Sequence, residues 1–275
     1  MAASGFELPN GFVNHGPMAC EALATLGFTE EIHGWARRFS RAGVPAVEPE
    51  MPTTFDWRGS LGDYQKLPEW IGTFEVAIVD EGWPQVVQTW VPRLMPGLAT
   101  VLFHGMIRVA HAVRAVDHVE TEPRRRELAR SLGYWAARFK PGHPWDTWPE
   151  VQDVHGAIRA AAADGAARYV ASPSIYYLHG VTGAMAVDLL LPHLAEPDRE
   201  PALAQLRAEH AAMYAGETPV TDIQAAGISE EDLARAADAS GDPHQVKLVE
   251  ACARGLRATG APAFAVAAET VTSLG

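Results

Sequence analysis

Two histidines of this chain stand inside apolar segments, where an imidazole needs a partner. His104 lies in the segment 102–107 and His179 in the segment 175–183, and a glycine follows each of them. Glycine lets another group approach the backbone closely. The two His-Gly pairs look like ligand positions that face each other. A hydrogen-bonded core histidine fits each position equally well, because a neutral imidazole can play either part.

Two further histidines, His15 and His155, are also candidates. His15 follows Asn14 in a turn that leads into a predicted helix, where a capping residue or a metal ligand would fit. His155 is followed by glycine as well, but Asp153 and Arg159 make its helix face more polar. His155 is therefore a secondary candidate, and an alternative if one of the other histidines is not a ligand.

Arg108 and His111 follow His104 on the same predicted helix. His111 comes seven residues after His104, so both side chains project from roughly the same helix face, two turns apart. A second histidine on that face favours a site there and makes His111 an alternative ligand. Arg108, one turn after His104, can pair with a substrate or with a carboxylate. We therefore predict catalytic roles for Arg108 and His111.

His244 and Lys247 lie three residues apart in another predicted helix. This spacing puts both on one helix face, as in the Glu-x-x-His pairs of helical metal-binding bundles. A lysine ammonium cannot bind a metal, because it offers donors only. Burial lowers a lysine pKa, however, and a neutral amine can take up CO2 to become a carbamate, an anionic oxygen ligand. The alternative is a solvated lysine that pairs with Glu250.

The composition argues against several other classes of protein. The 275 residues carry a formal net charge of −12, and the one dense basic run, residues 124–126, is followed by Glu127, so we expect no nucleic-acid partner. There is no P-loop, no GxGxxG after a strand, no GxSxG and no HExxH. With only two cysteines, no signal-peptide pattern and no apolar run of ~20 residues, we expect a cytoplasmic protein without membrane insertion.

Helical periodicity recurs along almost the whole chain. It predicts helices over 18–26, from 29 onward, and over 67–80, 83–94, 98–116, 122–139, 151–169, 174–194, 201–214, 229–239, 243–257 and 262–273. The segment 43–61 is rich in proline and glycine and predicts a long loop that could cover a pocket. Because no linker is long enough to demand a boundary, we predict an all-α fold, one multi-helix domain over residues 1–275.

Four of these motifs, in this order, resemble the questin oxidase-like family, and the resemblance spans most of the chain. The motifs are NH at 14–15, LFHGMI at 102–107, LHGVTG at 178–183 and HQVK at 244–247. Members of that family oxidise or open rings of anthraquinone-like polyketides. For one branch, the resemblance implies a mononuclear non-heme Fe(II) held by His15, His104, His179 and His244, with Lys247 as a carbamate.

The resemblance thus implies an oxygenase that acts on a small polycyclic aromatic substrate with O2. Five protein ligands would leave one octahedral position for O2, and the substrate would bind beside the metal. A second interpretation is an NADPH-linked Baeyer-Villiger oxidase without bound iron, for which the sequence shows no nicotinamide or flavin motif. A third is a helical ligand-binding protein without catalysis.

Overall fold

The computed structural model describes residues 4–42, 44–145, 150–217, 222–223, 227 and 229–273. These residues form a single all-α domain with thirteen α-helices and no strand, and it is 72% helical. The prediction of an all-α fold is confirmed. Among the described residues, no helix is both long enough and apolar enough to cross a membrane.

The helices follow one another through mostly short connections. The first seven are α1 (Gly16–Thr25), α2 (Ile32–Ala42), α3 (Trp57–Ser60), α4 (Leu67–Glu81), α5 (Trp83–Leu94), α6 (His104–His118) and α7 (Glu122–Arg138). The remaining six are α8 (Val154–Ala171), α9 (Ile175–Leu190), α10 (Glu196–Met213), α11 (Glu230–Ser240), α12 (Pro243–Thr259) and α13 (Pro262–Ser273). Short 3-10 helices adjoin α4, α5 and α9: η1 (Tyr64–Lys66), η2 (Met95–Gly97) and η3 (Leu191–His193).

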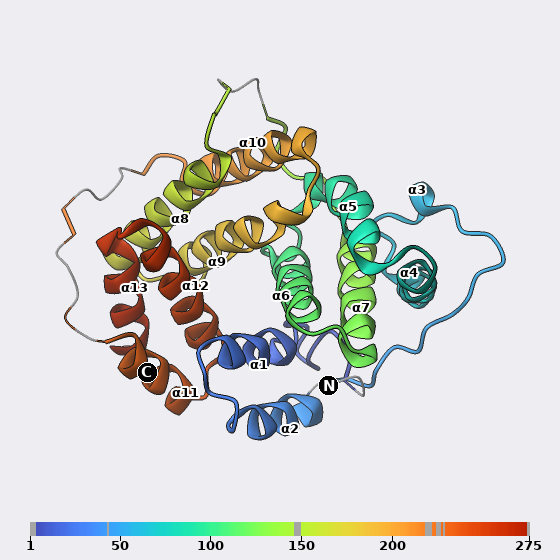
Figure 1. Ribbon diagram of the computed structural model, residues 1–275, viewed down its shortest axis with the longest axis horizontal. Helices are drawn as coiled ribbons and strands as arrows, with labels where there is room; N and C mark the ends of the chain where they lie inside the picture. Colours follow the sequence, from blue (N-terminus) through green and yellow to red (C-terminus); the bar gives the residue numbers. More distant parts are fainter. Residues whose placement is uncertain are drawn as a thin grey trace.

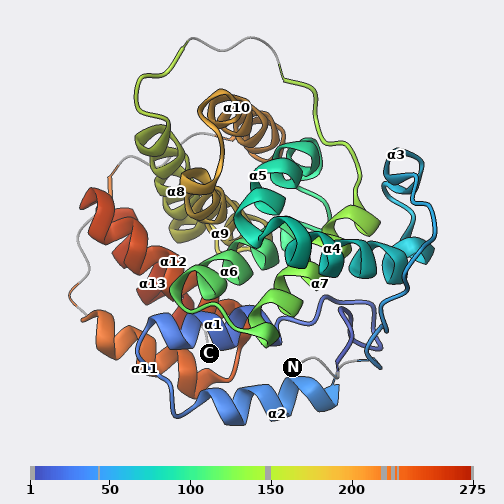
Figure 2. The ribbon, with the colours of Figure 1, turned by 45° about the vertical axis from the view of Figure 1, so that its right-hand side comes forward.

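Four helices from distant parts of the chain meet in the middle of the molecule. Helix α6 packs against α1 and α9, and α12 packs against the same two helices. Figure 1 shows α6 and α9 at the centre, with α4, α5 and α7 on one side and α8, α12 and α13 on the other. In Figure 2, α2 and α11 lie outside α1 at one edge. The beginnings of α1, α6, α9 and α12 are therefore available to build a common site.

Two predicted helix starts differ from the structure by five residues or more. The helix predicted from residue 98 begins at His104, after a left-handed turn. The helix predicted from residue 201 begins at Glu196, because Pro197 and the acidic residues of its first turn favour an earlier start. The predicted loop at 43–61 is confirmed for residues 44–56, while α3 occupies its end and residue 43 lies outside the described residues.

The turn before α6 has a strained backbone. Val101, Leu102 and Phe103 have φ angles of 49°, 52° and 66°. A left-handed conformation costs about 1–2 kcal/mol for each residue that carries a Cβ. Packing offsets this cost, because the buried Phe103 ring lies against Gly183, where an added Cβ would come within 2.8 Å of it. The turn places His104 at the first residue of α6, not in the middle of a helix as predicted.

Candidate metal centre

Four histidines from four separate segments meet in the interior. His15 is the N-cap of α1, His104 is the first residue of α6, His179 lies in the second turn of α9, and His244 lies in the first turn of α12. One ring nitrogen of each histidine lies within 4.8 Å of those of the other three. These four residues, which we call the four-histidine cluster, could hold a metal ion.

The separations inside the four-histidine cluster suit ligands of a single metal. The Nε2 atom of His104 lies 2.7 Å from Nε2 of His15 and 3.0 Å from Nε2 of His179. Two nitrogen ligands placed 2.0–2.1 Å from a metal, at right angles, would be ~3 Å apart. The His244 ring centroid lies 4.4 Å from that of His15 and completes the group.

Hydrogen bonds at the far side of two rings determine which nitrogen is free. The Nδ1 atom of His104 lies 2.6 Å from the carbonyl oxygen of Val101, and Nδ1 of His179 lies 2.7 Å from that of Ile175. A carbonyl only accepts, so each Nδ1 carries the proton and donates it, which leaves Nε2 with a lone pair. Two lone pairs then face each other at 3.0 Å, an arrangement that repels unless a cation lies between them.

A proton is a poor candidate for that cation. His15, His104 and His179 are buried, and burial followed by the nearby charge of Lys247 lowers their pKa values well below 6.5. At neutral pH the imidazoles are therefore uncharged, the form that binds metals. His244 differs, because its side chain is 27% exposed and its Nδ1 lies 3.1 Å from Oδ1 of Asp242. His15, His104 and His179 are thus the buried members of the cluster, and His244 is its partly exposed member.

Lys247 is buried beside the four-histidine cluster. Its side chain is 1% exposed, and among the described residues its Nζ atom has no hydrogen-bond partner. Burial lowers its pKa to about 7. The alternative of a solvated lysine paired with Glu250 is wrong, because Glu250 binds Arg114 and Arg254 instead. Lys247 therefore provides an amine that is partly neutral at physiological pH, close to the unprotonated imidazoles of His15, His104 and His179.

His111 and Arg108 lie outside the four-histidine cluster. The Nδ1 atom of His111 is 2.5 Å from Oε2 of Glu21 in α1, and Nε of Arg108 donates to Oε1 of Glu127 in α7 at 2.8 Å. Seven residues advance a helix by ~10 Å, so His111 shares a face with His104 without sharing its site. Of the two partners predicted for Arg108, the structure shows the carboxylate.

His155 belongs to a different group of side chains. It lies at the start of α8, where its Nδ1 atom is 2.8 Å from Oδ1 of Asp188 in α9. The polar face noted in the sequence is thus an ion-pairing face, and His155 does not replace a member of the four-histidine cluster.

Sequence reasoning missed the residues that orient the imidazoles. Asp242 caps α12 by accepting from the backbone N–H of His244, and it also faces the His244 ring. The Asp-Pro-His order at the helix start is a recognisable capping signal that could have identified it. The carbonyl groups of Val101 and Ile175 carry no such signal, because a carbonyl is present in every residue.

Comparison with known protein families, curated proteins and solved structures found no match for this chain. The resemblance to the questin oxidase-like family therefore remains a prediction. The geometry of the four histidines shows a cluster that could hold a metal ion.

Proposed function

We propose that this protein is an iron-dependent oxygenase whose four-histidine cluster holds Fe(II). One observation carries the proposal, namely the two unprotonated Nε2 atoms of His104 and His179 that face each other at 3.0 Å in a dry interior. Imidazole ligands suit iron as well as zinc, copper and nickel. The choice of iron rests on the resemblance of the motifs to the questin oxidase-like family.

Lys247 would supply the fifth ligand as a carbamate. The lone pair of the neutral Nζ atom forms a bond to the carbon of CO2, and Nζ releases a proton, so the product is an N-carboxylate with one negative charge. Its burial and its pKa of about 7 support this step, because a substantial fraction of the amine is neutral at physiological pH. Four neutral imidazoles and one anion would suit a divalent cation, and iron bound there would supply O2 binding and electron transfer.

The surroundings of the four-histidine cluster favour an apolar substrate. Val101 and Ile175, whose carbonyl groups hold two of the imidazoles, are 37% and 44% exposed, and Tyr176 is 60% exposed. Exposed apolar side chains next to a site are typical of a surface that receives an apolar ligand. They support a polycyclic aromatic as substrate, and His244, whose side chain is 27% exposed, is the member of the cluster that reaches solvent.

Arg108 and His111 would act on the site through the helices. Arg108 pairs with Glu127 of α7, and His111 pairs with Glu21 of α1, so these contacts join α6 to both helices. We therefore propose that they position His15 and His104 instead of contacting the substrate.

Metal analysis of protein purified without oxygen tests the proposal. We expect about one iron per chain in the wild type and a loss of most of it in His179→Ala. His118→Ala is the matched control, because His118 ends the same helix that His104 begins and is exposed. Wild-type protein without iron, or iron retained by His179→Ala, would contradict the assignment.

Turnover is the second test. Iron-loaded protein should consume O2 when an anthraquinone-type substrate is added, and the His179→Ala variant should not. Consumption that requires NADPH and is unaffected by His179→Ala would favour the Baeyer-Villiger interpretation instead.

A further inference from the structure

A pocket lies between α6, α8, α9, η3 and α12. Its volume is about 530 Å³, within the usual range for small-molecule sites, and no described residue that lines it belongs to the four-histidine cluster. Six of the eleven described residues that line it are charged: Arg114, Arg159, Arg254, Arg257, Asp117 and Asp188. Three carboxylates outside the lining, Glu21, Glu230 and Glu250, pair with three of these arginines, and Asp188 pairs with the fourth, so each arginine of the lining has a carboxylate partner. We call this the arginine pocket.

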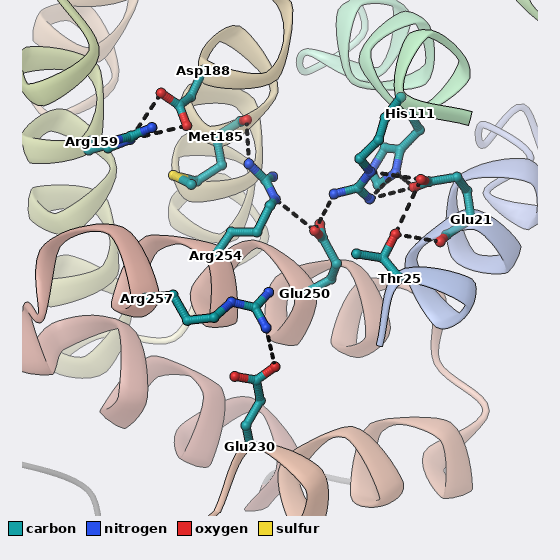
Figure 3. A network of polar contacts seen from close by, with 11 residues as sticks. Glu21, Thr25, His111, Arg159, Met185, Asp188, Glu230, Glu250, Arg254 and Arg257 are labelled. Carbon is teal, nitrogen blue, oxygen red and sulfur yellow. Dashed lines mark hydrogen bonds and ion pairs between the residues drawn. The ribbon is translucent and has the colours of Figure 1, made fainter. Parts of the chain in front are cut away.

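Buried carboxylates hold three of these arginines in place. Asp188 in α9 is 8% exposed and accepts from Nε of Arg159 at 3.1 and 3.2 Å, and from His155 at 2.8 Å. Figure 3 shows the contacts between Arg159 and Asp188. Both bonds from Arg159 use Nε, so they do not engage its two terminal amino groups. A guanidinium with a fixed Nε and free ends is prepared to receive an oxyanion.

Glu250 in α12 holds Arg254 and Arg114 in place. Its side chain is 1% exposed and accepts from Nε of Arg254 at 2.7 Å and from Nη1 of Arg114 at 2.5 Å. Burial raises the pKa of Glu250, but the charges of Arg254 and Arg114 outweigh burial and lower it below the usual range. Arg254 also donates Nη1 to the carbonyl of Met185, as Figure 3 shows. The carboxylate thus stays ionised and keeps both guanidinium groups ordered.

The arginines differ in the donors they can offer. Arg114 uses Nε, Nη1 and Nη2 on Glu21 and Glu250, so it contributes its charge and little else. Arg257 uses Nη1 on Glu230. Arg159, Arg254 and Arg257 therefore have donors that these ion pairs do not use. The rest of the lining consists of His155 and His193 and of the apolar residues Leu189, Pro192 and Ala258.

We propose that the arginine pocket binds a small organic anion, a carboxylate carried on an apolar body such as an aromatic ring. The guanidinium fork matches the two oxygens of a carboxylate, and its flat face stacks on aromatic rings. Leu189, Pro192 and Ala258 would cover the apolar body. This site is independent of the proposed iron centre.

Calorimetric titration of the full chain with 1-naphthoate tests the proposal. We expect saturable binding that weakens by about tenfold or more in Arg159→Gln and in Arg257→Gln, because each removes a charge-assisted contact. Arg235→Gln is the matched control, since this arginine of α11 is exposed, makes an i,i+4 ion pair with Glu231 and does not line the pocket. Binding should be unchanged in Arg235→Gln, and circular dichroism shows whether each variant is folded.

Two further titrations separate the alternatives. Inorganic phosphate should bind far more weakly than 1-naphthoate, since it has no apolar body, and equal affinity would overturn the assignment. His179→Ala should bind 1-naphthoate as the wild type does, and loss of binding would place the ligand at the four-histidine cluster. Absence of saturable binding, or equal affinity in wild type, Arg159→Gln and Arg257→Gln, would also overturn it.

Discussion

Replacement of Lys247 should raise stability and lower metal binding together. In metal-free protein the buried amine must lose its proton or stay charged in an apolar site, and neither state is favourable. The pKa of Lys247 falls from 10.5 to about 7, and at about 1.4 kcal/mol per pKa unit this difference costs about 5 kcal/mol of folding free energy at neutral pH. Methionine has a similar length and no charge, so Lys247→Met should raise the free energy of unfolding of the metal-free protein by at least about 2 kcal/mol.

The stability gained in Lys247→Met should depend on pH. Between pH 7 and 10.5 the unfolded lysine binds a proton that the folded one releases, so wild-type stability rises with pH in that window. The advantage of Lys247→Met should therefore be largest near pH 7 and shrink toward pH 10. Urea unfolding of chelator-treated protein at both values measures it, and iron content after reconstitution measures the loss of the ligand.

Lys140→Met provides the control, because Lys140 is exposed. We expect it to change the free energy of unfolding by less than about 0.5 kcal/mol at either pH and to leave iron binding intact. The reasoning is refuted if Lys247→Met destabilises the metal-free protein at pH 7 and still binds iron as the wild type does. That result would mean that Lys247 is a structural residue whose amine is well paired.

Three other predictions concern Glu250, Gly183 and His210. Glu250→Gln should lower the free energy of unfolding by about 3–5 kcal/mol in urea titrations, because it leaves the guanidinium groups of Arg114 and Arg254 without their buried counter-charge. Gly183→Ala should lower the free energy of unfolding by about 1–3 kcal/mol and reduce the iron content, because the new Cβ would displace Phe103 and the turn before His104. Its control is Gly34→Ala on α2, where the added Cβ has free space and should leave stability unchanged or raise it. Burial lowers the pKa of His210 to about 4, so between pH 6.5 and 4 the unfolded state binds a proton that the folded state does not, and the free energy of unfolding should fall by up to about 3 kcal/mol as the pH drops through that window. Urea titrations at pH 7 and pH 4.5 should show a smaller fall in His210→Phe than in the wild type. An equal fall in both proteins would contradict this prediction.

The sequence by itself predicts the helical architecture and the candidate ligands. Apolar periodicity and Pro/Gly breaks are local signals, so most helices fall where the pattern places them, including α9 and α12. The histidines in apolar surroundings are also visible, because an imidazole in such a segment needs a partner wherever it lies. Periodicity fails at the start of α6, because a left-handed turn at 101–103 is stabilised by the contact of Phe103 with Gly183, 80 residues away in the chain.

Only the tertiary structure decides which of these residues act together. His104 and His111 share a helix face, yet packing directs one to the cluster and the other to Glu21 of α1. Lys247 has the same sequence pattern as a surface lysine, and it is buried because α12 packs against α1 and α9 at that point. Side-chain burial and the meeting of four distant segments are properties of the packed helices, and no local pattern encodes them.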